Sequence, residues 1–194
     1  MRRFAPCILL FALVAGSGCA SPRSNFYTLD SAAKPVATGA DYSVAVGPVS
    51  VPSAVDRPQI VVRIAPNQVA IEEFHRWVSP LPDAIARVVA ENLAAMLGTP
   101  HVTVFSRPTA AGARYRVLID VLRFESAPGD AAILDAVWTV RSAEDGTTRS
   151  GRTTVREPVM GREYSTLAAA HSSALGRLSA EVAGAIRGLA PAGR

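Results

Sequence analysis

Cysteine and long apolar runs are both scarce in this sequence. Only Cys7 and Cys19 occur in 194 residues, and Cys7 lies inside an N-terminal segment typical of a cleaved export signal. Removal of that segment leaves one cysteine, so no disulfide can form within the chain. The apolar run over residues 5–14 has ten residues, no later run is longer, and a bilayer-spanning helix needs about 20. These shortages exclude a disulfide-rich domain and a polytopic membrane protein.

Lysine is nearly absent, and the excess of basic residues is small. The chain has 20 basic and 16 acidic residues, and Lys34 is its one lysine. Arg2 and Arg3 belong to the export signal, which leaves 18 basic residues and a net charge of +2. The other arginines are scattered without a block, whereas nucleic-acid binding needs a basic patch or stripe. We therefore predict no nucleic-acid partner.

Residues for catalysis or metal binding are also few. The three histidines, His75, His101 and His171, fall in separate predicted elements without a second ligand at metal-binding spacing. No nucleophile elbow, phosphate-binding glycine loop or dinucleotide fingerprint is found. His171 lies on an apolar helical stripe, where a buried structural histidine is favoured over a catalytic base. We predict no catalytic residue, cofactor or metal, and hence a protein that is not an enzyme.

The N-terminus has the layout of a bacterial lipoprotein. Residues 1–18 form a signal peptide of two arginines, an apolar core and four small residues, and Cys19 follows directly. Its thiol would take a diacylglycerol and its amine a further acyl chain. The alternative is ordinary cleavage after Ala20, which would discard Cys19. Because Ala20 is not aspartate, we expect sorting to the periplasmic face of the outer membrane, with residues 19–24 as the lipidated tether and 25–190 as one domain.

Alternation of apolar residues predicts several strands. One runs over 42–51 with a kink at Gly47-Pro48, and residues 60–64 and 69–74 form a hairpin. Residues 115–124 are apolar on both faces, which predicts a central strand partly covered on both sides. The polar stretch 147–156 fits an edge strand. The remaining expected strands cover 25–29, 102–106 and 132–140.

Two segments show helical periodicity. Apolar residues recur at steps of three and four over residues 82–97, and again over about 25 residues near the C-terminus, from Leu167 to Leu189. Residues 30–40 have neither period and are expected to be a surface connection. The predicted fold class is α/β, a mixed β-sheet of about seven strands with two long amphipathic helices packed on it.

Four longer phrases, in order, resemble a known family. The first phrase, just after the cysteine, is Ser-Pro-Arg-Ser-Asn-Phe-Tyr-Thr-Leu (21–29), and the second runs from Val-Gly-Pro-Val to Ile-Val-Val-Arg (46–63). The third is Glu-Phe-His-Arg-Trp-Val-Ser-Pro-Leu (73–81), and the fourth consists of Asn-Leu-Ala (92–94) and Leu-Gly (97–98). These phrases are similar to those of the PqiC family of ABC-type transport auxiliary lipoproteins.

The resemblance implies a non-catalytic outer-membrane subunit of a Pqi-type lipid transport system that supports envelope integrity. Its implied partners are a periplasm-spanning MCE-domain (PqiB-like) protein and, through it, an inner-membrane PqiA-like protein. A homo-oligomer is left open. The alternative function is a periplasmic lipid or small-molecule carrier with its own apolar pocket.

Arg57, Arg76 and Trp77 are the predicted partner-binding residues. They lie in these phrases near the predicted ends of adjacent strands, and arginine and tryptophan often anchor interfaces. The alternative interpretation is structural: Trp77 fills the core and Arg76 pairs with a carboxylate.

Overall fold

The structure is a computed structural model that describes residues 22–37 and 43–190. Cys19, the signal peptide and the expected start of a strand at Tyr42 lie outside these residues. The described chain forms one eight-stranded sheet and two long helices. The elements are β1 (Asn25–Tyr27), β2 (Val44–Ser50), β3 (Gln59–Ala65), β4 (Gln68–Trp77), α2 (Leu81–Leu97), β5 (Val102–Val104), the short 3-10 helix η1 (Pro108–Ala110), β6 (Tyr115–Ala127), β7 (Ala131–Ser142), β8 (Thr148–Pro158) and α3 (Tyr164–Leu189).

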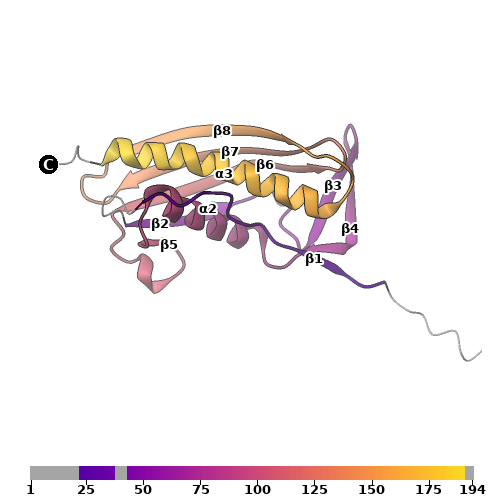
Figure 1. Cartoon of the computed structure of the whole chain (residues 1–194), viewed down its shortest axis with the longest axis horizontal. Helices are drawn as coiled ribbons and strands as arrows, with labels where there is room; N and C mark the ends of the chain where they lie inside the picture. Colours follow the sequence, from indigo (N-terminus) through magenta and orange to yellow (C-terminus); the bar gives the residue numbers. More distant parts are fainter. Residues whose placement is uncertain (1–21, 38–42, 191–194) are drawn as a thin grey trace, which may run out of the picture.

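Strand β6 is the centre of the sheet, as predicted. It pairs antiparallel with β7, and its other edge carries parallel β2 and, further along, parallel β3. β5 extends the sheet beyond β2, β4 and β1 extend it beyond β3, and β8 is the edge strand beyond β7. Figure 1 shows α3 lying along β6, β7 and β8, with α2 on the same side of the sheet. The mixed α/β fold with two packed helices is confirmed.

The two faces of β6 are covered to different degrees. Tyr115 and its alternate neighbours up to Val121 are buried, but Leu118 and Leu122 on the other face are 36% and 45% exposed. The pairing register shifts between Val121 and Arg123. This bulge reverses the alternation, so Phe124 joins the buried face. One face of the central strand therefore lies open.

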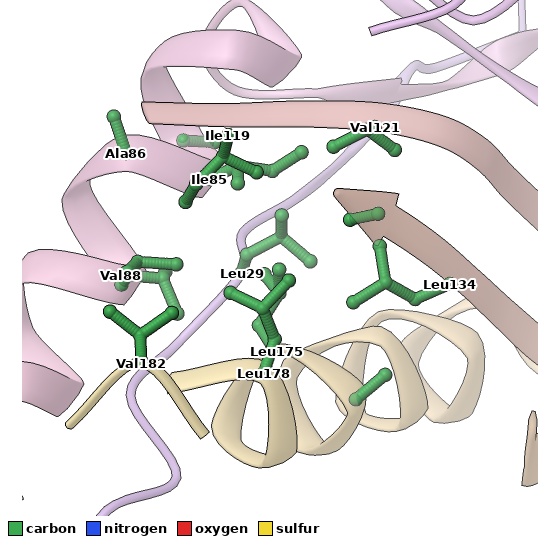
Figure 2. Close-up of a cluster of buried hydrophobic side chains, with 14 of the residues drawn as sticks. Leu29, Ile85, Ala86, Val88, Ile119, Val121, Leu134, Leu175, Leu178 and Val182 are labelled. Carbon is green, nitrogen blue, oxygen red and sulfur yellow. The ribbon is translucent and has the colours of Figure 1, made fainter. Parts of the chain in front are cut away.

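The two helices cover the opposite face through the predicted stripes. Helix α2 has proline and aspartate in its first turn and ends at Gly98, which has a left-handed φ of 64°. Figure 2 shows Leu175 and Leu178 of α3 near Leu29, and Val182 near Val88 of α2. All five side chains are fully buried. The hydrophobic core thus lies between the helices and one face of the sheet.

The segment over residues 28–36, here called the N-terminal strap, crosses both helices. It has no regular secondary structure, as expected, but its backbone is bound to the domain. The Arg87 guanidinium donates to the Leu29 carbonyl, and the Asp30 amide donates to Ser172 Oγ at 3.0 Å. The Val36 amide donates to the Ala95 carbonyl at 3.0 Å. The strap is part of the folded domain and not a loose connection.

Asn92 is the main polar contact of the strap. Its Oδ1 accepts hydrogen bonds from Ser31 Oγ at 2.8 Å and from the amides of Ala32 and Ala33 at 3.0 and 3.1 Å. Its Nδ2 donates to Ser179 Oγ of α3 at 3.2 Å. Asn92 is fully buried, so one side chain joins the strap, α2 and α3.

Candidate docking surface

The helix-free side of the sheet, here called the outer face, carries exposed apolar side chains. Register places Leu118 opposite Thr139 and Asp120 opposite Val137 across β6 and β7, and Arg63 opposite Val69 across β3 and β4. A patch of this kind on a folded domain often marks an interaction surface. Its exposed apolar members are Val69, Ile71, Leu118, Leu122 and Val137.

A groove of about 350 Å³ lies in the outer face where β3, β4 and β6 meet. The loop over residues 52–57 forms one wall and is held by hydrogen bonds from the Val55 and Asp56 amides to the Pro52 carbonyl. We call it the β3–β6 groove. Its lining residues are Pro52, Ala54, Val55, Arg57, Val61, Arg63, Val69, Ile71, Leu122, Arg123, Phe124, Glu125 and Ser126.

Two buried polar atoms in this groove have no hydrogen-bond partner among the described residues. They are Arg57 Nε and Glu125 Oε2. The nearest group to Glu125 Oε2 in an ion pair is Arg63 Nε, at 3.7 Å, which is too long for a hydrogen bond. An unpaired buried donor or acceptor costs about 1–3 kcal/mol. A partner in the groove that drew these side chains toward it, with one acceptor and one donor, would remove that cost.

The other two predicted partner-binding residues, Arg76 and Trp77, do not line this groove, and they differ in exposure. Arg76 donates from Nε to the Glu73 carbonyl at 2.9 Å and approaches its carboxylate at 3.7 Å. Trp77 is 6% exposed and packs edge-on against Phe124 and His171. Both residues thus make the contacts of the structural alternative, in which Trp77 fills the core and Arg76 pairs with a carboxylate. The Trp77 amide donates to the Pro58 carbonyl at 2.7 Å, which brings the two predicted phrases together. Partner binding by Arg57, Arg76 and Trp77 stays a prediction.

His171 is a core residue that does not itself line the β3–β6 groove, although two of the side chains it contacts, Phe124 and Ser126, do. It is fully buried, stacks on Phe124 with ring centroids 3.8 Å apart, and its Nε2 lies 2.9 Å from Ser126 Oγ. Burial lowers the pKa of His171 to about 3. The imidazole is therefore neutral in the folded protein at neutral pH.

This burial predicts a pH-dependent stability. The unfolded chain takes up a proton at His171 below about pH 6.5, whereas the folded protein does not, so the free energy of unfolding falls as the pH falls from about 6.5 toward 3. The slope from this residue approaches about 1.4 kcal/mol per pH unit. Denaturant titrations between pH 7 and pH 5 should show a smaller slope for His171→Gln and an unchanged slope for the exposed control His101→Gln. Equal slopes for all three proteins would contradict the assignment.

Sequence reasoning missed most of the groove lining and Asn92. Val61, Ile71 and Leu122 were counted among the apolar residues of strands, and only their pairing shows that they share an open face. For Asn92 a signal was available. It lies three residues after Val89 and four after Val88, on the apolar stripe of α2. A polar residue at such a position must find partners inside the fold.

The described residues contain neither a metal-binding cluster nor a helix that could span a membrane. No group of three or more histidine, cysteine, aspartate or glutamate side chains is placed to hold a metal ion within 22–37 and 43–190. Over the same ranges, no helix combines the length and apolar character required to cross a bilayer.

Comparison with solved structures supports the fold. An uncharacterised protein matches with a TM-score of 0.69 and 19% identity, over 85% of this chain and 99% of its own. A Xanthomonas campestris protein assigned to the family DUF330 matches with a TM-score of 0.66 and 21% identity, over 86% of this chain and all of its own. At these identities the likeness shows the fold alone. No curated protein matches the sequence.

The family is shown by a sequence model. The model for the ABC-type transport auxiliary lipoprotein component matches residues 27–183, which include every described strand from β2 to β8 and most of α3. Its members are lipoproteins, which implies a membrane-anchored location in the cell envelope, and the family is not one of enzymes. The match agrees with the PqiC-like phrases in the first half of the chain. This chain belongs to the ABC-type transport auxiliary lipoprotein family.

Proposed function

We propose that this protein is a non-catalytic outer-membrane lipoprotein that docks, through the β3–β6 groove, on the periplasm-spanning MCE-domain component of a Pqi-type lipid transport system. Cys19 would carry the lipid anchor at the periplasmic face of the outer membrane. The inner-membrane PqiA-like protein would be reached through the MCE-domain partner. In this role the domain supports envelope integrity by holding the end of the transport machine.

The observation that carries this proposal is the pair of unpartnered polar atoms in an apolar groove. Arg57 Nε can donate a hydrogen bond and Glu125 Oε2 can accept one. The groove that they line also includes the apolar residues Val61, Ile71 and Leu122. A protein segment with alternating apolar and polar groups complements such a surface. The loop over 52–57 places Arg57 at its wall, and arginine is a frequent interface anchor.

The carrier alternative has less support. A carrier for a lipid or small molecule needs an enclosed apolar pocket, and ligand pockets bury most of the ligand surface. The β3–β6 groove lies on the open face of the sheet, whereas the space between helices and sheet is filled by buried side chains such as Leu93, Leu134 and Leu175. The groove suits a partner that lies across it.

Arg57→Ala and Arg76→Ala test the docking proposal. Arg76 is partly exposed, so Arg76→Ala should keep its unfolding free energy within about 0.5 kcal/mol of the wild type. Arg57→Ala removes a buried unpaired donor and should be at least as stable as the wild type. We expect both to weaken capture of the purified MCE-domain protein in a pull-down, and Arg57→Ala to weaken it more because its Nε lines the groove. The control is Arg114→Ala, which removes an exposed pair with Glu144 and should bind normally.

The double variant gives the decisive comparison. A folded Arg57→Ala/Arg76→Ala protein that captures the partner as well as the wild type would place the interface elsewhere. If both single variants lost their thermal transition, the two arginines would be structural residues. Extraction of bound lipid from the purified wild type would favour the carrier.

A further inference from the structure

A second groove lies in the outer face, toward the start of β6 and the end of β7. It has a volume of about 670 Å³, and its walls include the segment around η1. We call it the arginine groove because three arginines line it. Its lining residues are Ala45, Phe105, Arg107, Pro108, Ala110, Ala111, Gly112, Ala113, Arg116, Leu118, Arg141, Ser142, Ala143 and Gly146.

The three arginines differ from most others in the described chain because no carboxylate lies within 4 Å of them. Eight arginines of the described ranges form such ion pairs: Arg63, Arg76, Arg87, Arg114, Arg123, Arg152, Arg156 and Arg177. Arg107, Arg116 and Arg141 are absent from that set, and no acidic residue lines their groove. Their charges therefore add to a local formal charge of +3.

The pairing of β6 with β7 places two of these arginines side by side, which is unfavourable without a ligand. Arg116 on β6 stands directly opposite Arg141 on β7, and like charges at such cross-strand positions destabilise a sheet. The nearby acids Glu144 and Asp145 are already engaged. Glu144 pairs with Arg114 at 2.7 Å, and Asp145 accepts from the amide and hydroxyl of Thr147 at 3.0 and 2.6 Å.

The remaining wall of the groove is apolar. The Arg116 guanidinium lies 3.9 Å from the centre of the Phe105 ring, a cation–π contact that fixes its position. Leu118, which is 36% exposed, follows Arg116 on the same face of β6. The site therefore combines convergent guanidinium groups with an apolar surface next to them.

We propose that the arginine groove binds a phosphate group through Arg107, Arg116 and Arg141. Planar guanidinium groups match the oxygens of a phosphate in bidentate geometry, and several of them together suit its multiple charge better than a single carboxylate. The phosphate belongs to a phospholipid headgroup or to a free phosphate ion. The apolar wall of Phe105 and Leu118 would add contacts for the lipid alone. This site is separate from the docking groove and does not depend on the docking proposal.

Calorimetric titration of the full lipidated chain in non-ionic detergent tests the site. The probes are dihexanoyl phosphatidylglycerol, inorganic phosphate and an oligoglutamate peptide. The test variant is Arg107→Gln/Arg141→Gln, because neither side chain makes a hydrogen bond or ion pair within the described chain and folding should be unchanged. We expect at least a tenfold loss of affinity for the phosphate probe that the wild type binds. The control Arg63→Gln/Arg123→Gln, in the β3–β6 groove, removes the same number of charges and should bind like the wild type.

Each result decides the proposal. Binding of phosphatidylglycerol much more tightly than inorganic phosphate identifies the headgroup as the source, and similar binding of both identifies free phosphate. Equal affinities of the wild type and a folded double variant would overturn the site. Binding of oligoglutamate without either phosphate probe would also overturn it, and would assign the groove to an acidic protein segment.

Discussion

Replacement of Leu178 by aspartate is expected to abolish stable folding. Leu178 lies in α3 and is fully buried, close to Leu29 and Leu175 in Figure 2. A carboxylate there would have neither water nor a cationic partner, and burying an unpaired charge costs several kcal/mol. The free energy of unfolding of a domain is about 5–15 kcal/mol, so this substitution alone would remove much of it.

The matched control for this variant is Ala180→Asp, which introduces the same charge on the exposed side of α3. We expect its thermal midpoint to stay close to that of the wild type, while Leu178→Asp loses its cooperative transition in thermal melts followed by circular dichroism. If Leu178→Asp kept the wild-type midpoint, α3 would not be packed on the core as described.

Asn92→Leu is expected to destabilise the domain by about 4 kcal/mol, since it removes four hydrogen bonds that each contribute about 1 kcal/mol. The volume of the side chain is nearly kept, so the loss comes from the polar contacts and not from a cavity. Three of the four bonds hold the strap at Ser31, Ala32 and Ala33. The strap should therefore detach before the rest of the fold opens.

Hydrogen exchange can separate these two effects. In Asn92→Leu the amides of Ala32 and Ala33 should lose their protection, while amides in the centre of β6 and β7 keep most of theirs. Ser31→Ala is the control, because it removes one of the four bonds and should cost about 1 kcal/mol. Unchanged protection at Ala32 and Ala33 in Asn92→Leu would show that Asn92 does not hold the strap.

Local patterns predicted most elements of this fold, because each element has its own periodicity. The apolar stripe of α2 and the glycine that ends it can be recognised within a short stretch of sequence. The alternation of β6 up to Val121 can be recognised in the same way. The bulge after Val121 was not predictable in this way, since no proline or glycine marks it. The parallel pairing of β1 with β4 joins Asn25 to His75, and short-range patterns carry no information on such distant contacts.

The candidate site was predicted less well than the fold. The phrases containing Arg57 and Arg76 do meet in space, but burial of Trp77 depends on which face of β4 meets the helices. The β3–β6 groove depends on a loop, three strands and their register, so single residue types could not indicate it. The arginine groove combines residues 45 to 146 for the same reason.

The N-terminal strap also determines an order of events in time. Asp30 bonds to Ser172, which is 142 positions further along the chain, and Asn92 connects the strap to Ser179. An exported chain emerges with its N-terminus first, and contacts between distant residues form late in folding. The bond from Asp30 to Ser172 therefore forms only once α3 is present, whereas the bonds of the strap to Asn92 of α2 can form earlier. Cys19 lies outside the segment that these contacts hold, so a variant whose strap cannot bind α3 should still take the proposed lipid.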